Sequence, residues 1–367
     1  MPSFDISKDF RMEKSKQRTS SSPRLSAIDL FCGCGGMTEG LKQAGFQVLW
    51  GNDVAAHPLM AYRANHPEVL VDEKDIRQIE CKKLMTELGL KKGELDLLAG
   101  CPPCQGFSSI RTNNGRYSIP DERNDLINDY LRFVEAFRPK VVMLENVPGL
   151  KDDSRFENFV ATMSDLGYQG EWKILNVADY GVPQRRRRLI YVAAYKKNIL
   201  ISGKENEYRT VRDAIGALPA AGQSGDFMHD FPEQRTNKIQ EMIALIPKDG
   251  GSRSQLPAKY ILPCHKRNPE GFKDVYGRMA WDKPSPTITG GCASPSKGRF
   301  LHPEENRCIT LREASLLQGF PRNYIFPAGL PKDRLALMVG NALPVPFIYA
   351  HAKEIKQQIK KWKAKND

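Results

Sequence analysis

The chain has 367 residues, enough for about two domains, and its 40% apolar and 27% charged residues are ordinary for a globular protein. This composition argues against wholesale disorder, and the length excludes a disulfide-stapled miniprotein. We find no apolar run near the ~18 residues of a membrane span, and no apolar stretch of the secretory type at the start. We therefore expect a cytoplasmic protein without a membrane segment, whose eight cysteines are reduced thiols.

The net charge of +12 is distributed unevenly along the chain. Residues 1–24 carry a net +3, residues 184–300 carry +10 and residues 353–367 carry +4. The first segment is polar and rich in serine, so we expect a flexible basic arm. The central block mixes Lys and Arg with aromatic residues, a composition typical of surfaces that bind phosphates and stack bases. Charge alone thus favours nucleic acid as the partner.

Residues 25–200 alternate between short apolar runs and helical patterns. The apolar runs predict strands, and the segments between them predict helices. This alternation predicts an α/β fold of the Rossmann-like type, a parallel sheet covered by helices on both faces. The predicted strands are 26–31, 47–53, 95–100 and 140–147, and the first two predicted helices are 37–46 and 55–66.

The pattern changes in the second half of the chain. Two strand-like runs, 172–181 and 187–194, lie close together and predict an antiparallel finish to the sheet. Residues 201–300 are placed in a small second domain, because their central part, about 221–277, is irregular and dominated by Pro, Gly and charged residues. Residues 301–367 read as helical and are expected to return to the first domain.

A glycine loop follows the first predicted strand. Gly33, Gly35 and Gly36 allow the backbone to turn tightly and approach a ligand at a helix N-terminus. Asp53 stands 20 residues after Gly33, at the end of the second strand, where a carboxylate can hold ribose hydroxyls. A dinucleotide fingerprint would need glycine at position 38, where the chain has Thr38. The loop favours an adenosine-containing ligand without a pyrophosphate, although a glycine turn that binds nothing would look the same.

A Cys-x-x-Cys pair, Cys101 and Cys104, directly follows the third predicted strand. The two prolines between the cysteines suit a rigid loop that holds one thiol towards a cleft. The spacing alone leaves a nucleophile, a metal ligand and an inert thiol open. A zinc site would need two more ligands at comparable spacing, and the sequence offers no such pair, so we expect no metal.

Charged residues mark the ends of two other predicted strands. Glu145 ends one of them, at the edge of a parallel sheet where ligands bind, although a helix cap would equally explain the Glu-Asn pair. In the second, alternation directs Arg186 and Arg188 to one face and Arg185 and Arg187 to the other. If the first face borders the crevice, two guanidinium groups lie beside the thiol and the carboxylate.

Together these motifs resemble those of the bacterial-type cytosine C5 DNA methyltransferases. The resemblance covers most of residues 25–350, apart from about 221–277. It implies that residues 25–200 form a catalytic domain that binds S-adenosylmethionine and that residues 201–300 form a target-recognition domain. The matching segments, in the family's order, are DLFCGCGG, the acidic end of WGND, DI at 75–76, GCPPCQGFS, LENVPG, DYGVPQRRRR, LREASLLQGFP and VGNALP.

The resemblance also implies a covalent mechanism. The thiolate of Cys104 would add to C6 of a flipped cytosine, C5 would attack the methyl group of S-adenosylmethionine, and loss of the C5 proton would release the thiol. Glu145 would share a proton with N3, and Arg186 and Arg188 would lie near the base and the thiol. The residues that match the family's cofactor contacts are Phe31, Gly33, Gly35, Asp53, Asp75, Ile76, Pro103, Leu126, Asn341 and Ala342.

The implied substrate is double-stranded DNA, held by the basic block, with the loop 105–120 able to close over the flipped base. We expect a monomer, at the nucleoid if the source is bacterial, and a cognate restriction endonuclease stays open as a further partner. The nearest alternative is a tRNA cytosine-5 methyltransferase, but its Cys-Phe-Thr tripeptide is not found in this sequence. An NAD-dependent oxidoreductase is disfavoured by Thr38 and the thiol motif, and a catalytically silent DNA-binding module by the intact Cys104, Glu145 and Arg186.

Overall fold

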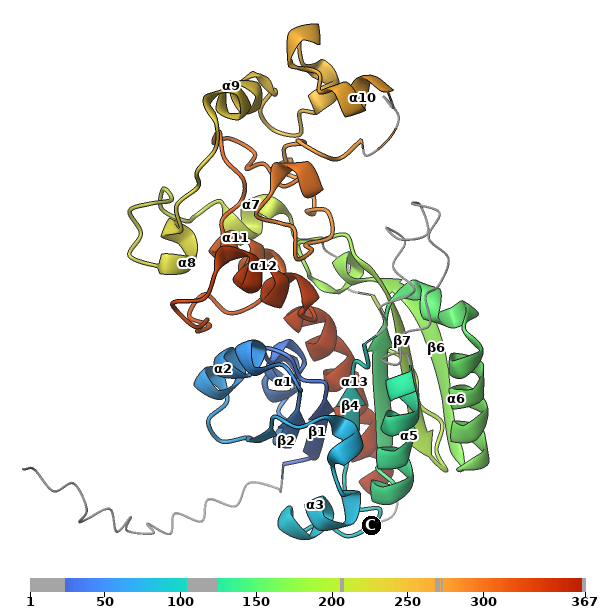
Figure 1. Cartoon of the computed structure of the whole chain (residues 1–367). Coiled ribbons are helices and arrows are strands. Elements are labelled where there is room, and N and C mark those ends of the chain that lie inside the picture. Colours follow the sequence, from blue (N-terminus) through green and yellow to red (C-terminus); the bar gives the residue numbers. More distant parts are fainter. Residues whose placement is uncertain (1–23, 104–124, 205–207, 268–270, 272, 365–367) are drawn as a thin grey trace, which may run out of the picture.

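The computed structural model of the chain describes residues 24–103, 125–204, 208–267, 271 and 273–364. Within these residues the chain forms two lobes, a larger one built on a sheet and a second one beyond the carboxyl ends of its parallel strands (Figure 1). Three sequence-based expectations fall outside the described residues: the basic arm up to residue 23, Cys104, and the loop 105–120.

A seven-stranded sheet forms the larger lobe, with the strand order β3-β2-β1-β4-β5-β7-β6. Strands β1 to β5 run parallel, while β7 runs antiparallel to both β5 and β6. The expected Rossmann-like α/β fold with an antiparallel finish is confirmed. The strands are β1 (Ser26–Leu30), β2 (Gln47–Asn52), β3 (Leu70–Asp72), β4 (Leu97–Gly100), β5 (Val141–Asn146), β6 (Tyr168–Asn176) and β7 (Arg187–Tyr195).

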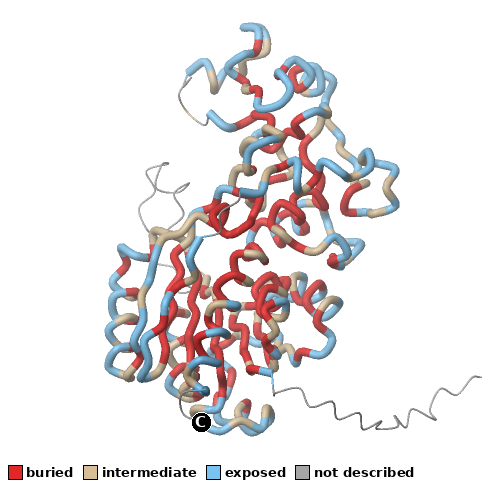
Figure 2. Tube along the Cα trace, turned by 180° about the vertical axis from the view of Figure 1, so that it is seen from behind, coloured by how far each residue is buried: buried red, intermediate tan, exposed pale blue. Residues whose placement is uncertain are grey.

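Alternate residues of the central strands enter two apolar cores, one on each face of the sheet. Val141 and Met143 of β5 pack in one core, and Val142 and Leu144 pack in the other. Burial on both faces explains why the strands read as continuous apolar runs, and Figure 2 shows them buried at the centre of the lobe. Helices α1 (Gly36–Gln43), α2 (Ala56–Asn65) and α13 (Val345–Lys363) contribute to the first core, and α3 (Cys81–Glu87), α5 (Leu126–Phe137) and α6 (Ser154–Asp165) to the second.

One helical stretch is long and apolar enough, by composition, to cross a membrane. It spans Lys332–Lys363, which comprises α12 (Lys332–Asn341) and α13, and 72% of its apolar window is buried inside the fold. Phe347, Ile348 and Ile355 of α13 belong to the first sheet core. The apolar composition of this stretch is therefore accounted for by packing within the protein.

The second lobe is defined by a third apolar core, which unites residues between 211 and 342 and also includes Val345 at the start of α13. Helices α11 and α12 belong to this core, which also takes in Cys34 and Ala61 from the sheet lobe. The domain limits expected at residues 200 and 300 stay predictions. Besides α12, the helices of this lobe are α7 (Val211–Ile215), α8 (Phe227–Asp230), α9 (Asn237–Leu245), α10 (Pro263–Arg267) and α11 (Leu311–Leu317).

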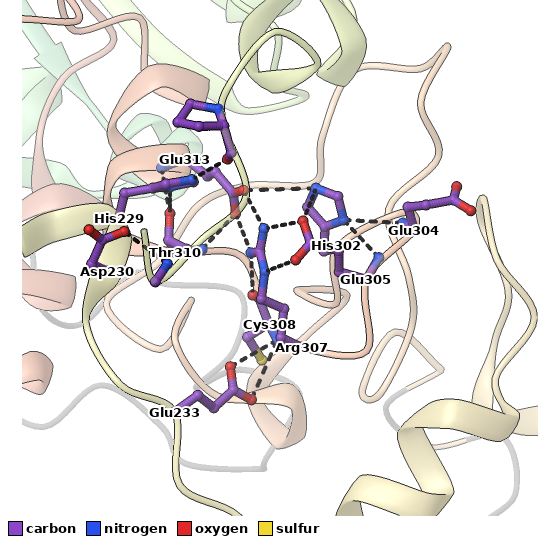
Figure 3. A network of polar contacts seen from close by, with 12 residues as sticks. His229, Asp230, Glu233, His302, Glu304, Glu305, Arg307, Cys308, Thr310 and Glu313 are labelled. Carbon is purple, nitrogen blue, oxygen red and sulfur yellow. Dashed lines mark hydrogen bonds and ion pairs between the residues drawn. The ribbon is translucent and has the colours of Figure 1, made fainter. Parts of the chain in front are cut away.

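A buried polar network joins the region of α8 to the start of α11 (Figure 3). Arg307 donates two hydrogen bonds of 2.8 Å to the carboxylate of Glu313. The ring of His229 lies 2.9 Å from both the Thr310 hydroxyl and the Pro219 carbonyl oxygen. Arg312, the neighbour of Glu313, forms an ion pair with Asp226 of the α8 cap. These side-chain contacts connect irregular segments of the second lobe that are not joined by sheet hydrogen bonds.

Candidate active site

A cavity of about 830 Å³ opens at the carboxyl edge of the parallel strands. Its wall is formed by the loops that follow β1 to β5, by two arginines at the start of β7 and by the C-terminal part of α12. Gly35 is not part of its lining, and Cys104 lies outside the described residues. The sequence-predicted residues that line the cavity are Phe31, Gly33, Asp53, Asp75, Ile76, Pro103, Leu126, Glu145, Arg186, Arg188, Asn341 and Ala342.

One part of the cavity wall is the glycine loop after β1. Gly33 has a φ of 53°, and a Cβ built on it would meet nothing within 4 Å, so the backbone leaves open space at this point. The amide of Gly33 donates to Oδ2 of Asp53 at 2.9 Å, and Oδ1 of Asp53 accepts from the Ala55 amide at 2.9 Å. Burial raises the pKa of this carboxyl. Asp53 thus shapes the loop and also presents its carboxylate to the cavity.

Gly35 has a packing role instead of a lining role. It is the N-cap of α1 with a φ of 95°, and a Cβ on it would lie 2.5 Å from Tyr324 Oη and 2.6 Å from His66 Nε2. Tyr324 belongs to the third core, that of the second lobe, and donates a 2.6 Å hydrogen bond to the Cys34 carbonyl. The missing side chain therefore lets the second lobe touch the glycine loop.

Asp75 is the N-cap of the 3₁₀ turn η1 (Ile76–Gln78), which begins at Ile76, and both residues line the cavity. The Asp75 side chain accepts from the Arg77 amide at 2.9 Å and forms an ion pair with the Arg77 guanidinium, which holds the pKa of that carboxyl below its usual range. A ligand contact to Asp75 would share an oxygen with Arg77. Next to it, Ile76, Phe31 and Leu126 supply apolar surface.

Glu145 lies at the other end of the cavity and is 1% exposed. Nε of Arg188 is 3.0 Å from Glu145 Oε1, an ion-pair distance, yet within the described residues no hydrogen bond reaches this oxygen. The thiol of Cys101 donates to the other oxygen, Oε2, at 2.8 Å. Burial and the neighbouring carboxylate raise the pKa of Cys101, so this cysteine is a neutral donor.

Arg186 is a buried residue of the cavity wall that is hydrogen-bonded to the second lobe. Its Nη1 donates to the carbonyl oxygens of Ile288 at 3.2 Å and Gly340 at 3.0 Å. Burial lowers the pKa of this guanidinium to about 9, so it stays charged at neutral pH. Arg185 and Arg187 are exposed, so the alternation expected along this run is confirmed.

Asn146 lines the cavity, although no role in the site was predicted for it beyond the alternative of a helix cap. Its side-chain amide donates to the Pro102 carbonyl at 2.9 Å, and its Oδ1 accepts from the Val147 amide at 2.8 Å. The side chain is 3% exposed. Asn146 therefore fixes the proline pair that leads to position 104. The signal for it is a polar residue at the end of an apolar run, beside a carboxylate.

Comparison with known proteins shows the family to which the chain belongs. The family model of the C-5 cytosine-specific DNA methylases matches residues 25–357. The type II methylase M.HgiDII of Herpetosiphon aurantiacus is 37% identical, with 90% of this chain and 95% of the relative covered. The type II methyltransferase M1.HphI of Haemophilus parahaemolyticus is 32% identical, with 90% and 86% covered.

Among solved structures, the S. pombe Dnmt2 methyltransferase shares the fold, with a TM-score of 0.60 at 18% identity over 92% of this chain and 99% of the other. A prophage-encoded E. coli protein assigned as a DNA modification methyltransferase has a TM-score of 0.67 at 23% identity, over 92% and 99%. The chain belongs to the C-5 cytosine-specific DNA methylase family and is a DNA cytosine-5 methyltransferase.

Proposed function

We propose that the cavity holds S-adenosylmethionine at its glycine-loop end and a flipped cytosine at its Glu145 end. The observation that carries this proposal is Glu145 Oε1, a carboxylate oxygen in a nearly fully buried side chain that receives no hydrogen bond from the described residues and lies 3.0 Å from a guanidinium. A buried acceptor of this kind is costly unless a ligand supplies a donor. The ring of a pyrimidine protonated at N3 supplies one.

The glycine-loop end suits an adenosine-containing ligand. Open space at Gly33, the carboxylate of Asp53 and the apolar side chains of Phe31, Ile76 and Leu126 offer room, an acceptor for hydroxyls and a slot for a flat ring. Pro103, Asn341 and Ala342 complete the same wall. S-adenosylmethionine, when bound, supplies the methyl group.

At the other end, Cys104 is the proposed nucleophile on the sequence motif. Its thiolate forms a bond to C6, and the electron pair of the C5–C6 double bond moves to C5, which becomes nucleophilic. Glu145 holds a proton at N3 so that charge does not build up on the ring, and Arg186 and Arg188 favour the thiolate electrostatically. After methyl transfer a base such as solvent water takes the C5 proton, the C5–H electron pair restores the C5–C6 double bond, and the S–C6 pair returns to sulfur, which restores the thiolate.

Double-stranded DNA is the proposed form of the substrate, and the second lobe, with residues 201–300, is the proposed recognition domain. The net +10 of residues 184–300 favours phosphate contacts. Because relatives are type II methyltransferases, we propose a cognate restriction endonuclease that cuts the same site. We further propose that the enzyme acts as a cytoplasmic monomer.

Two variants test the site. Cys104→Ser should abolish methyl transfer from labelled cofactor to duplex DNA and prevent covalent trapping by a duplex with 5-fluorocytosine, while cofactor binding measured by calorimetry stays nearly unchanged. Glu145→Gln should lower kcat about 100-fold, because general acid–base groups contribute rate factors of this order. Glu157→Gln, at an exposed position of α6, is the matched control and should leave kcat unchanged.

Substantial turnover by Cys104→Ser would refute the nucleophile, and equal rates for Glu145→Gln and the wild type would refute the proton-holding role. A tRNA sample run beside the duplex separates the two substrate classes. Faster methylation of the tRNA would refute DNA as the substrate.

A further inference from the structure

Of the two cysteines in the Cys-x-x-Cys pair, the proposed mechanism uses Cys104 and assigns no role to Cys101. It directly follows β4, and the parallel register pairs Gly100 with Leu144 of β5, so the next residues along the two strands, Cys101 and Glu145, emerge side by side. Both line the cavity. The thiol reaches Glu145 Oε2 at 2.8 Å, a direct contact between the two side chains.

A second contact repeats this pattern one residue further. The Asn146 amide donates to the Pro102 carbonyl at 2.9 Å, so residues 101 and 102 are tied in order to residues 145 and 146. The end of β4 and the end of β5 are thus joined by two successive side-chain bonds at the point where the chain runs towards position 104. A cysteine that merely filled space at this point would not need its sulfur aimed at a buried carboxylate.

The two oxygens of Glu145 are in different situations. Oε2 is occupied by the Cys101 thiol, whereas Oε1 receives no hydrogen bond from the described residues and faces the Arg188 guanidinium. A carboxylate held by one oxygen cannot rotate freely, so its other oxygen keeps a fixed direction. The sulfur is also weakly hydrated, which suits it to a site from which water is excluded.

We propose that Cys101 is a positioning residue for methyl transfer, which fixes the carboxylate of Glu145 through Oε2 so that Oε1 is presented to N3 of the target cytosine. The proposal rests on the proposed function of Glu145. Cys101 itself forms no bond with the substrate, and its raised pKa keeps the proton on sulfur, so it does not compete with Cys104 as a nucleophile.

A double-mutant cycle tests this proposal, with single-turnover methyl transfer to duplex DNA as the readout. Cys101→Ala should lower the rate about tenfold, because hydrogen bonds to charged groups are worth roughly that factor, while Kd for DNA and for cofactor stays within about twofold. Cys101→Ser keeps a donor and should recover most of the rate. In the Glu145→Gln background, Cys101→Ala should change the rate less than about twofold, since its effect passes through Glu145.

Cys81→Ala is the matched control, because this cysteine is buried in α3 outside the cavity, and its rate should equal that of the wild type. A tenfold loss from Cys101→Ala in both backgrounds would show a merely structural role and overturn the proposal. An unchanged rate for Cys101→Ala alone would do the same. If Glu145→Gln alone keeps the wild-type rate, the proposed function of Glu145 fails. This single variant therefore distinguishes that failure from a failure of the proposal for Cys101.

If Cys101→Ala does not fold, the difference infrared spectrum of the wild type minus Cys101→Ser carries the test. We expect an S–H stretching band at lower frequency than that of a thiol without a hydrogen bond, and Glu145→Gln should move it. A band at the frequency of a free thiol would overturn the proposal.

Discussion

The two lobes hold their backbones together in different ways. In the sheet lobe, hydrogen bonds between neighbouring strands pair the backbone, and two apolar cores cover the two faces. The second lobe joins its short helices to long irregular segments, and side chains take over much of this pairing. Arg278 shows how, since it is 0% exposed and its guanidinium donates to acceptors inside the lobe.

The Arg278 guanidinium satisfies carbonyl groups at the C-terminal end of α9 and in the segment 302–305. It donates to the backbone oxygens of Ile243, Ile246, His302 and Glu305, and to the side chain of Asn306. Buried carbonyl groups without donors are costly, so one guanidinium with five N–H groups replaces several rungs of a sheet. The comparison teaches that an irregular lobe can be as tightly specified as a sheet, but by single residues.

The largest effect on stability should therefore come from Arg278. Arg278→Met keeps much of the apolar stem but removes five hydrogen bonds, among them those to the buried carbonyl oxygens of Ile246 and His302. We therefore expect a loss of about 4 kcal/mol in the unfolding free energy of the second lobe. Hydrogen exchange read by mass spectrometry along a urea series would show residues 211–342 opening first, with the sheet strands unchanged.

The matched control is Arg212→Met, which removes an exposed ion pair with Asp282 and should leave exchange in both lobes as in the wild type. If Arg278→Met opened both lobes at the same urea concentration, the distinction between them would not hold.

A smaller effect is expected at the contact between the lobes. Gly35→Ala should destabilise the protein by about 2 to 3 kcal/mol, because the left-handed backbone and the clash with Tyr324 Oη add. Gly33 also has a positive φ, but a Cβ built on it meets no atom within 4 Å. Gly33→Ala should therefore lower the unfolding free energy by only about 1 kcal/mol, and its main effect should be weaker cofactor binding. Thermal unfolding and calorimetry with S-adenosylmethionine would separate the two, and equal stabilities would contradict the packing role of Gly35.

The same difference between the lobes decides what sequence can predict. The strands around Ile28, Leu98 and Val142 follow from apolar runs, and Gly45, with a φ of 86° just after α1, is of the residue type that commonly ends a helix. Such signals lie within a short stretch of sequence, so they can be recognised without knowledge of the fold. Strand β3 has only three residues, too few for an apolar run that would predict a strand.

The second lobe lacks local signals because its contacts are made over long separations. Nothing in the sequence around Arg278 indicates that it serves carbonyl groups 24 to 35 residues away. In the site, resemblance to the family named twelve of the residues that line the cavity, and their individual roles stay predictions. Neither motif nor periodicity indicates the bonds of Cys101 and Asn146, because both depend on the register of β4 against β5.

The smallest effect concerns histidines, which the two lobes bury differently. In the second lobe both ring nitrogens of His229 are bonded, whereas neither nitrogen of His351 in α13 has a hydrogen-bond partner among the described residues. His351 packs instead on the rings of Phe347 and Tyr180, at centroid distances of 4.6 and 4.9 Å. Burial lowers the pKa of His351 from 6.5 to about 3, so this histidine is neutral in the folded protein.

As the pH falls below about 6.5 the unfolded chain gains a proton at His351 and the folded chain does not, so stability is lost from that pH down towards pH 3. At pH 5 the loss is about 2 kcal/mol from this residue, and at pH 7 it is close to zero. His351→Phe fills the same aromatic site without a titrating group. The difference in unfolding free energy between variant and wild type, measured in urea, should therefore grow in favour of the variant on going from pH 7 to pH 5. Because other titrating groups are common to both proteins, they cancel in this difference.

A difference in unfolding free energy that stays constant between pH 7 and pH 5 would contradict this prediction. It would mean that His351 is protonated in the folded protein as readily as in the unfolded chain, and the contrast with His229 would then disappear.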